Sequence, residues 1–430
     1  MRVWLLVLAV WARASGLRVV TGAVSMRDPQ FHRIRRLPPY VFSEVNAMKA
    51  EARAAGRDII DFGMGNPDQP PPKAVTDKLV EVLQDPRVHR YSTSRGIAGL
   101  RRAQAAYYER RFGVRLDPER ELIVTLGSKE GLANLAAAIT APGDVILAPN
   151  PSYPIHPYGF IIAGAAIRHV PMLPEVDLMA ELARAVQHSV PPPTALILNF
   201  PANPTTRVVG HDFYREVVAF AKRHEIFILS DLAYAEIYFE HAPPSILEVE
   251  GAREVAVEFT SMSKTYSMPG WRIGFAAGNP QLIGALARIK SYLDYGAFTP
   301  IQVAATAAIN ACEGAIDEIR QRYRERRDVL VEGLHTAGWP VPAPPATMFA
   351  WAPIPEPFRH LGSLAFSKLL LNEANVAVSP GIGFGEYGEG HVRLALVENR
   401  QRTRQAVRSI KAFLQRQRAA ETRPEPLAVA

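Results

Sequence analysis

The segment Val255–Phe275, VAVEFTSMSKTYSMPGWRIGF, decides the fold class of this 430-residue chain and points to its chemistry. It opens with a short apolar run typical of a buried strand, and it places Lys264 just after that run, eight residues before Arg272. A lysine amine forms an imine with an aldehyde, while guanidinium and hydroxyl groups bind phosphate. The pattern therefore suits a cofactor that carries both groups, with Ser261 and Ser263 sharing the phosphate with the arginine.

A solvated loop with a surface lysine and a surface arginine is the alternative for this segment. Taken alone, the S-x-S-K pattern is a weak signal. Joined to the run Gly270–Phe275, GWRIGF, it becomes specific, because a Trp-Arg-Ile-Gly run has no evident purpose in a solvated loop. We therefore favour the cofactor-binding interpretation.

Upstream of this segment, short apolar runs alternate with longer amphipathic ones. Strands are predicted at Glu121–Leu126, Asp144–Ala148, Ala195–Phe200, Ile226–Ser230 and Val255–Ser261. Helices are predicted between them, for example at Lys129–Thr140 and His211–His224. This alternation predicts an α/β fold with a large, mainly parallel sheet covered on both faces, over residues of about 70–300.

After Pro300 the pattern changes to long helices. Helices at Gln302–Ala337 and Ser363–Glu373, with short strands around Met348 and His391, predict a smaller α+β domain. Two domains also suit the length of the chain, which is greater than a single hydrophobic core ordinarily accommodates. The predicted division is an extension at 1–25, an N-terminal segment of the small domain at 26–67, a large cofactor-binding domain at 68–300, a small C-terminal domain at 301–415 and a flexible tail at 416–430.

Composition and charge exclude several classes of protein. Hydrophobic residues at 48% and charged residues at 21% are typical of a soluble globular chain. Residues 1–40 carry seven Arg and one Asp (+6), and residues 411–430 carry four basic and two acidic residues (+2), so the remainder of the net +7 sums to −1. Because the basicity belongs to the ends, no nucleic-acid partner is expected. The single cysteine, Cys312, is predicted as a small apolar side chain in a helix, and no metal site is expected.

The first 25 residues have the three parts of a secretory signal. These are Arg2, the apolar run Val3–Ala12 and the small-residue pattern at 12–14. The apolar run is too short to span a membrane. The rest of the chain looks like a cofactor enzyme of central metabolism, and Met26 opens a segment that looks like a natural start. We favour a misassigned start or a dispensable extension over export, and we expect a cytoplasmic protein without a membrane partner.

Polar residues follow the ends of predicted strands, where ligands of open α/β sheets collect. Asp231, directly after Ile226–Ser230, would pair with the protonated nitrogen of a pyridine ring and keep that ring electron-withdrawing. An N-cap of a following helix is its alternative. Tyr234 and Asn203 can reach a phenolic oxygen on the same ring, although Asn-Pro is also common turn chemistry.

Three further positions complete the candidate site. Gly127–Gly131 joins a strand to a helix, so its amides can cradle a phosphate at the positive helix end. Tyr153 could lay its ring on the pyridine face, with an ordinary core aromatic as the alternative. Arg393 lies in the alternating strand pattern His391–Leu396, where burial without a partner would be unfavourable. A substrate α-carboxylate would satisfy it, and an edge-strand arginine facing water is the alternative.

Together these motifs resemble, in their order along the chain, the fold-type-I, class I/II aminotransferases that use pyridoxal 5'-phosphate (PLP). The resemblance covers about Arg36–Phe413. The runs that carry it are RLPPYVF (36–42), YSTSRGI (91–97), GSKEGL (127–132), PNPSYPIH (149–156), DLAYAEI (231–237), ARIKSYLDYGAFTP (287–300) and VSPGIGFGEYG (378–388). Within the family they are most similar to bacterial enzymes of alanine biosynthesis that transfer an amino group from glutamate to pyruvate. The resemblance implies an aspartate-aminotransferase-like fold and a homodimer with shared active sites.

The resemblance also implies a role for each matched residue. Catalytic roles fall to Lys264, which holds PLP and carries the proton, to Asp231 at the pyridine nitrogen, and to Tyr234. Cofactor contacts fall to Tyr234 and Asn203 at the phenolic oxygen, Tyr153 on the ring face, and Ser128, Lys129 (through its backbone), Ser261, Ser263 and Arg272 at the phosphate. Tyr91 would reach the phosphate of the neighbouring subunit. Substrate contacts fall to Arg393, helped by the backbone of Gly65, and to Asn203.

The expected reaction is a two-step amino transfer from glutamate to pyruvate, giving 2-oxoglutarate and alanine. Aspartate, LL-diaminopimelate or aromatic aminotransferase activity stays open, because the pocket's side-chain preference is not fixed by the sequence. A γ-carboxylate needs a cation, and Arg95, Arg288 and Lys290 are available. A PLP-dependent C–S lyase is a further alternative. A PLP regulator fused to a DNA-binding module is disfavoured, because only about 40 residues precede the core.

Overall fold

A computed structural model of the chain describes residues 31–421. The predicted extension at 1–25 and residues 422–430 of the predicted tail lie outside this range. The chain divides into two units, Met1–Leu37 and Pro38–Ala430, and the described part of the first contains one short helix, α2 (His32–Arg35). None of the helices in the described range is long and apolar enough to cross a membrane. All that follows concerns the second unit.

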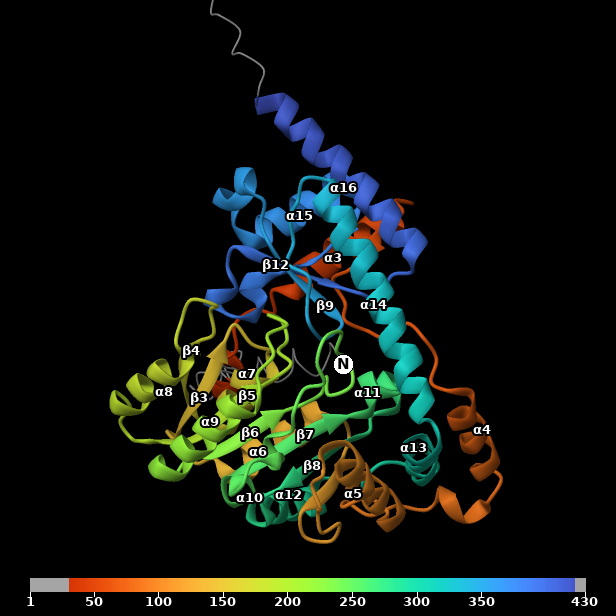
Figure 1. The fold of residues 1–430 in the computed structure, drawn as a ribbon, viewed down its shortest axis with the longest axis vertical. Helices are drawn as coiled ribbons and strands as arrows, with labels where there is room; N and C mark the ends of the chain where they lie inside the picture. Colours follow the sequence, from red (N-terminus) through yellow and green to blue (C-terminus); the bar gives the residue numbers. More distant parts are fainter. Residues whose placement is uncertain (1–30, 422–430) are drawn as a thin grey trace, which may run out of the picture. The chain divides into compact units, whose positions relative to one another are not determined.

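A seven-stranded sheet with strand order β2-β8-β7-β6-β5-β3-β4 forms the centre of the second unit (Figure 1). Its strands are β2 (Leu122–Thr125), β3 (Val145–Asn150), β4 (Ala166–Pro171), β5 (Pro193–Asn199), β6 (Phe227–Asp231), β7 (Ala256–Ser261) and β8 (Gly274–Gly278). Neighbours from β4 to β7 pair in parallel, whereas β8 is antiparallel to both β7 and β2. The predicted α/β class with a mainly parallel sheet is therefore confirmed.

Two strands of this sheet were not predicted. β4 is AIRHVP, a sheet-edge strand whose first residues are mostly exposed and polar, and β8 is the glycine- and alanine-rich run GFAAG. Neither has the β-branched or aromatic enrichment by which a strand is recognised. Both are strands because neighbouring strands supply hydrogen-bond partners, which a local pattern does not record.

The sheet is buried on both faces. In β5, Ala195 and Ile197 pack into one apolar core and Leu196 and Leu198 into another, as the two-residue period of a strand requires. The helices that line the first core are α6 (Ser128–Ile139), α7 (Ile155–Ala163) and α12 (Pro280–Leu293). Those that line the second include α5 (Ala98–Phe112), α8 (Leu178–Gln187) and α9 (His211–His224). Each fully buried Val, Leu, Ile or Phe side chain adds about 1.5–3 kcal/mol of transfer free energy.

A separate apolar core lies among smaller elements (Figure 1). The antiparallel sheet β11-β12-β9 and the parallel pair β1-β10 contribute to it. Their bounds are β1 (Ile60–Asp61), β9 (Phe349–Pro353), β10 (Val376–Ala377), β11 (Ser379–Pro380) and β12 (His391–Ala395). The associated helices are α3 (Phe42–Ala54), α14 (Glu313–Thr336), α15 (Gly362–Ala374) and α16 (Arg400–Glu421). This matches the expected α+β composition, while the domain boundaries stay a prediction.

The single helix predicted at 302–337 is two helices. α13 (Thr299–Ala311) packs on α4 (Lys73–Val82) and α5, and α14 begins after it. Cys312 lies between them, so the prediction of a helical Cys312 is wrong, although the side chain is buried as expected. Its N–H still bonds to Ala308 and its carbonyl accepts from Ala315, so the apolar periodicity continues across the break and hides it.

Candidate active site

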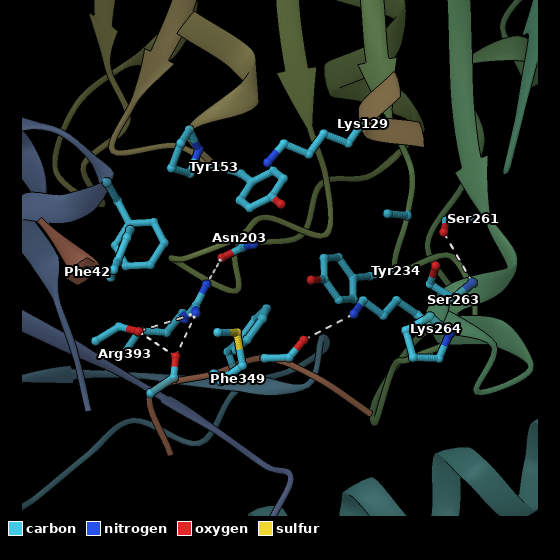
Figure 2. Close-up of a pocket in the computed structure, with 18 of the residues that line it drawn as sticks. Phe42, Lys129, Tyr153, Asn203, Tyr234, Ser261, Ser263, Lys264, Phe349 and Arg393 are labelled. Atoms are coloured by element: carbon cyan, nitrogen blue, oxygen red, sulfur yellow. Dashed lines mark hydrogen bonds between the residues drawn. The ribbon is translucent and has the colours of Figure 1, made fainter. Parts of the chain in front are cut away.

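A cavity of about 280 Å³ opens at the carboxyl ends of β5, β6 and β7 and faces β9, β11 and β12 (Figure 2). Twelve of the thirteen predicted site residues line it: Gly65, Ser128, Lys129, Tyr153, Asn203, Asp231, Tyr234, Ser261, Ser263, Lys264, Arg272 and Arg393. The thirteenth, Tyr91, does not. The twelve residues, which are far apart in the sequence, therefore lie on the wall of a single cavity.

One end of the cavity is suited to a phosphate. Gly127 adopts φ 85° and the helix α6 begins at the next residue, so the helix's free amides and positive dipole end point toward the cavity wall. Arg272 lies against this turn and donates to the carbonyls of Leu126 (3.1 Å) and Pro269 (2.9 Å). A Cβ on Gly127 would lie 2.3 Å from the Arg272 guanidinium, so only glycine allows this approach.

Lys264 lies in the one-turn helix α11 (Met262–Thr265) that follows β7. Its Nζ donates to the carbonyl of Gly65 at 3.2 Å (Figure 2). Burial, together with the nearby guanidinium groups of Arg393 and Arg272, lowers the pKa of Lys264 to about 8. A minor part of this amine is therefore neutral, and nucleophilic, near neutral pH, far more than at the ordinary lysine pKa.

Asp231 ends β6 and is buried, with one carboxylate oxygen 2.9 Å from Nε2 of the fully buried His156. The other oxygen accepts the N–H of Ala233 at 3.2 Å. No α-helix starts here within the described residues, so the N-cap alternative for Asp231 is wrong. Sequence reasoning missed His156, and the only local signal was its place in the run PNPSYPIH.

Arg393 is buried on β12, the central strand of its sheet, so the alternative of a water-facing edge arginine is wrong. Its guanidinium donates to Asn203 Oδ1 (2.8 Å) and to the carbonyl of Gly63 (3.3 Å), and its carbon lies 4.1 Å and 4.6 Å from the ring centres of Phe349 and Phe384. Burial lowers its pKa to about 10. Among the described residues no carboxylate pairs with it, so an anion entering the cavity would find an unneutralised cation.

Two aromatic residues and an amide occupy the remaining wall. The ring of Tyr153 stands edge-on to His156, with centroids 6.0 Å apart, and burial raises the pKa of its hydroxyl. Burial also raises the pKa of Tyr234, whose hydroxyl therefore stays protonated and able to donate. Because Asn203 uses its carbonyl oxygen to accept from Arg393, its amide nitrogen remains available to donate to a ligand.

None of the three cations considered for a second carboxylate lines the cavity. Lys290 is fully buried between Glu130 and Asp294, 2.8 Å from each. Arg95 donates to the backbone carbonyls of Glu119 and Leu122, and Arg288 lies over the ring of Tyr292.

Lys129 lines the cavity, although the sequence analysis did not consider it as a partner for a second carboxylate. Figure 2 shows its side chain reaching toward Tyr153, with Nζ 5.8 Å from the ring centre. No acidic partner is recorded for it among residues 31–421.

The family model for "Aminotransferase class I and II" matches residues 57–410. The chain therefore belongs to this family, and it is a transaminase that uses PLP.

Several relatives are similar over nearly their whole length. A putative aminotransferase, AatC, of Rhizobium meliloti is 67% identical over 386 residues, which is 90% of this chain and 95% of that protein. Glutamate-pyruvate aminotransferase AlaC of Escherichia coli is 56% identical over 387 residues (90% and 94%), and an LL-diaminopimelate aminotransferase of Moorella thermoacetica is 41% identical over 383 (89% and 97%). Among solved structures, substrate-bound BacF from Bacillus subtilis aligns with TM-score 0.83 and 32% identity, covering 90% of this chain and 98% of that one. A single mutant of Thermus thermophilus aspartate aminotransferase aligns with TM-score 0.83 and 30% identity (89% and 99%).

Capture of PLP by Lys264 should follow the neutral fraction of its amine. In cofactor-free protein mixed with PLP, the rate of formation of the borohydride-reducible linkage should rise with pH through a midpoint near 8, because the pKa is lowered from 10.5. Stopped-flow absorbance at a series of pH values measures this rate, with Lys264→Ala as the blank. A rate that keeps rising to pH 10 would show that the site does not depress the lysine's pKa.

Proposed function

We propose that this enzyme transfers an amino group from glutamate to pyruvate, giving 2-oxoglutarate and alanine. The observation that carries the proposal is the pair of cations facing one cavity, the partly buried Lys264 and the buried Arg393, with Asp231 at its wall. The similarity to AlaC, which is named for this substrate pair, supports the choice of substrates.

The residues around the cavity fit PLP. The anion cradle at Gly127 and Arg272 would take the phosphate, with Ser128, Ser261, Ser263 and the backbone of Lys129 as further donors. Asp231, oriented by His156, would hold the pyridine nitrogen protonated. The hydroxyl of Tyr234 and the free amide of Asn203 would donate to the phenolic oxygen, and Tyr153 would cover one ring face. Bound PLP supplies the electron sink that makes the substrate's α-proton acidic.

The protein residues then divide the work of transfer. Arg393 grips the α-carboxylate of each substrate by its planar fork, which orients the α-carbon toward Lys264. Lys264 removes the α-proton and delivers it again as the reaction proceeds, because lowering the pKa of its amine to about 8 makes the neutral, basic form accessible near neutral pH. The same two cations serve both half-reactions, because the amino acid and the oxo acid each carry an α-carboxylate.

Steady-state rates with an array of amino donors test the proposal. Glutamate with pyruvate should give a kcat/KM at least about tenfold above that of aspartate, LL-diaminopimelate or an aromatic donor, a difference of about 1.4 kcal/mol in transition-state binding. Alanine and 2-oxoglutarate should form in equal amounts, without ammonia, and Lys264→Ala should be inactive. Ammonia release without an acceptor would instead identify a lyase.

Lys129 is suited to select for the second carboxylate of glutamate. It lines the cavity without an acidic partner, whereas the other lining cations are committed to Gly65, to the α-carboxylate, to the phosphate or, for Lys49, to an ion pair with Asp61. A γ-carboxylate that displaces water from this ammonium would gain a charge-assisted hydrogen bond.

Lys129→Met should therefore discriminate between the two acceptors. The change keeps the length of the side chain and removes its charge, and a charged hydrogen bond is worth about 1.5–3 kcal/mol. We expect KM for glutamate and 2-oxoglutarate to rise roughly tenfold to a hundredfold, with KM for alanine and pyruvate nearly unchanged. Lys129→Arg, which keeps the charge, is the matched control. A uniform rise for all four substrates would assign Lys129 to the cofactor alone.

We also propose a cytoplasmic homodimer with shared active sites. Tyr91 is 86% exposed, and its ring lies 4.7 Å from that of Tyr295 at a tilt of 35°; Tyr292, Leu293 and Phe298, close to Tyr295 in the chain, are exposed as well. Large apolar side chains gathered on one surface favour a protein partner. A second copy seated there would bring Tyr91 toward the neighbouring phosphate.

Mixing two inactive variants tests whether the sites are shared. A Lys264→Ala chain and a Tyr91→Ala chain should recover activity when mixed, because heterodimers then contain one intact site. Activity of the mixture and heterodimer content by native mass spectrometry are measured together, with Tyr295→Ala in place of Tyr91→Ala as a surface control. Heterodimers without activity would show that Tyr91 serves its own chain or neither.

A further inference from the structure

The short segment Gly63–Gly65 contacts both catalytic cations. The carbonyl of Gly63 accepts from Arg393 Nη2 (3.3 Å) and from Ser379 Oγ (2.6 Å). Two residues later the carbonyl of Gly65 accepts from Lys264 Nζ (3.2 Å). Figure 2 shows Arg393 and Lys264 on opposite sides of the cavity, each with dashed hydrogen bonds, among them those to the carbonyls of Gly63 and Gly65. The backbone of this segment therefore spans the distance between the guanidinium and the amine.

The segment has no buried side chain of its own to hold it. A Cβ on Gly65 would lie 2.6 Å from the ring of Phe349, so that position excludes a side chain, and Met64 is exposed. The preceding residue, Phe62, is the last held by sheet bonds, through Ala377 and Ala395. Beyond it, the position of the segment depends on hydrogen bonds to single backbone groups.

Asp61 supplies the bond at the start of the segment. Its Oδ1 accepts the N–H of Gly63 at 3.0 Å, and among residues 31–421 this N–H has no other partner. Its Oδ2 lies 2.7 Å from Nζ of Lys49, and the side chains are 16% and 10% exposed. Lys49 projects from α3, so the ion pair holds the carboxylate in one orientation at the cavity wall. The more exposed Arg53 adds a longer contact of 3.4 Å.

We propose that Asp61, oriented by Lys49, is a positioning residue for the transfer reaction. By anchoring the Gly63 N–H it fixes the carbonyl that steadies Arg393, and so sets where the substrate α-carboxylate lies relative to the amine of Lys264. The proposal rests on the role of Arg393 proposed above. A purely structural ion pair between α3 and β1 would explain the burial of Asp61, and a local Asx turn would explain its bond to the Gly63 N–H. What neither predicts is an effect on the binding of an α-carboxylate, which the experiments below measure.

Two double variants isolate the single hydrogen bond. Lys49→Met/Asp61→Asn removes both charges and keeps an acceptor for the Gly63 N–H, whereas Lys49→Met/Asp61→Leu has nearly the same shape and no acceptor. Neither variant leaves a buried unpaired charge, which would itself destabilise the protein. We expect KM to be about tenfold higher in the leucine variant than in the asparagine variant. The rise should be the same for the amino donor and the oxo-acid acceptor, since both present an α-carboxylate. Melting temperature and the Kd for PLP should be equal in the two, because the phosphate cradle does not contact Asp61.

A second readout does not depend on turnover. Dead-end binding of the accepted oxo acid to the PLP form, measured by calorimetry, should weaken by the same factor of about ten. The matched control is Asp58→Ala, three residues before Asp61 in the chain. It breaks the exposed ion pair between Asp58 and Arg402 and should leave KM unchanged. Equal KM and equal oxo-acid affinity in the two double variants overturn the proposal. If wild type prefers another amino donor, the substrate assignment fails, yet the same comparison with that donor still decides the role of Asp61.

Discussion

Two unneutralised cations inside one cavity are the constraint on which this structure depends. Desolvation lowers the pKa of Arg393 to about 10, and desolvation together with the nearby guanidinium groups of Arg393 and Arg272 lowers the pKa of Lys264 to about 8. In place of acidic partners, Lys264 and Arg393 have backbone carbonyls, an amide oxygen and the faces of two aromatic rings. Neutral contacts of this kind hold the cations in place without cancelling their charge, so the attraction for anions is kept for ligands.

Much of this site could be predicted because the carboxyl ends of parallel strands lie at the same end of the sheet. Asp231 ends one apolar strand and Lys264 follows the next strand in the sheet. Because the two strands pair in parallel, both side chains lie at the same end of the sheet. Arg393 was recognisable because its strand is otherwise apolar. A charged residue at a buried register position is informative, since it needs a reason to be there.

What the sequence did not show depends on partners far away along the chain. His156 lies 75 residues from Asp231, and Asn203 accepts from an arginine 190 residues later. The ion pair of Lys49 with Asp61 looks, in one dimension, like any two charges near a helix. Lys290 looked free as a substrate ligand, yet it is fully buried and paired with Glu130 of α6 and with Asp294 at the end of its own helix. Local patterns identify which residue types are unusual, but only the folded chain shows which of them are already satisfied.

The reversed direction of β8 has a consequence for how such a site can change. Because β8 is antiparallel to β7, the first residue of β8 lies beside the last residue of β7 at one end of the sheet. The loop between them carries both Lys264 and Arg272. With the roles proposed for Lys264 and Arg272, the covalent anchor and the phosphate anchor of the cofactor would therefore be carried by one short loop between two paired strands. A change in the length of that loop would move the two proposed anchors relative to each other, and it would therefore disturb both cofactor contacts at once.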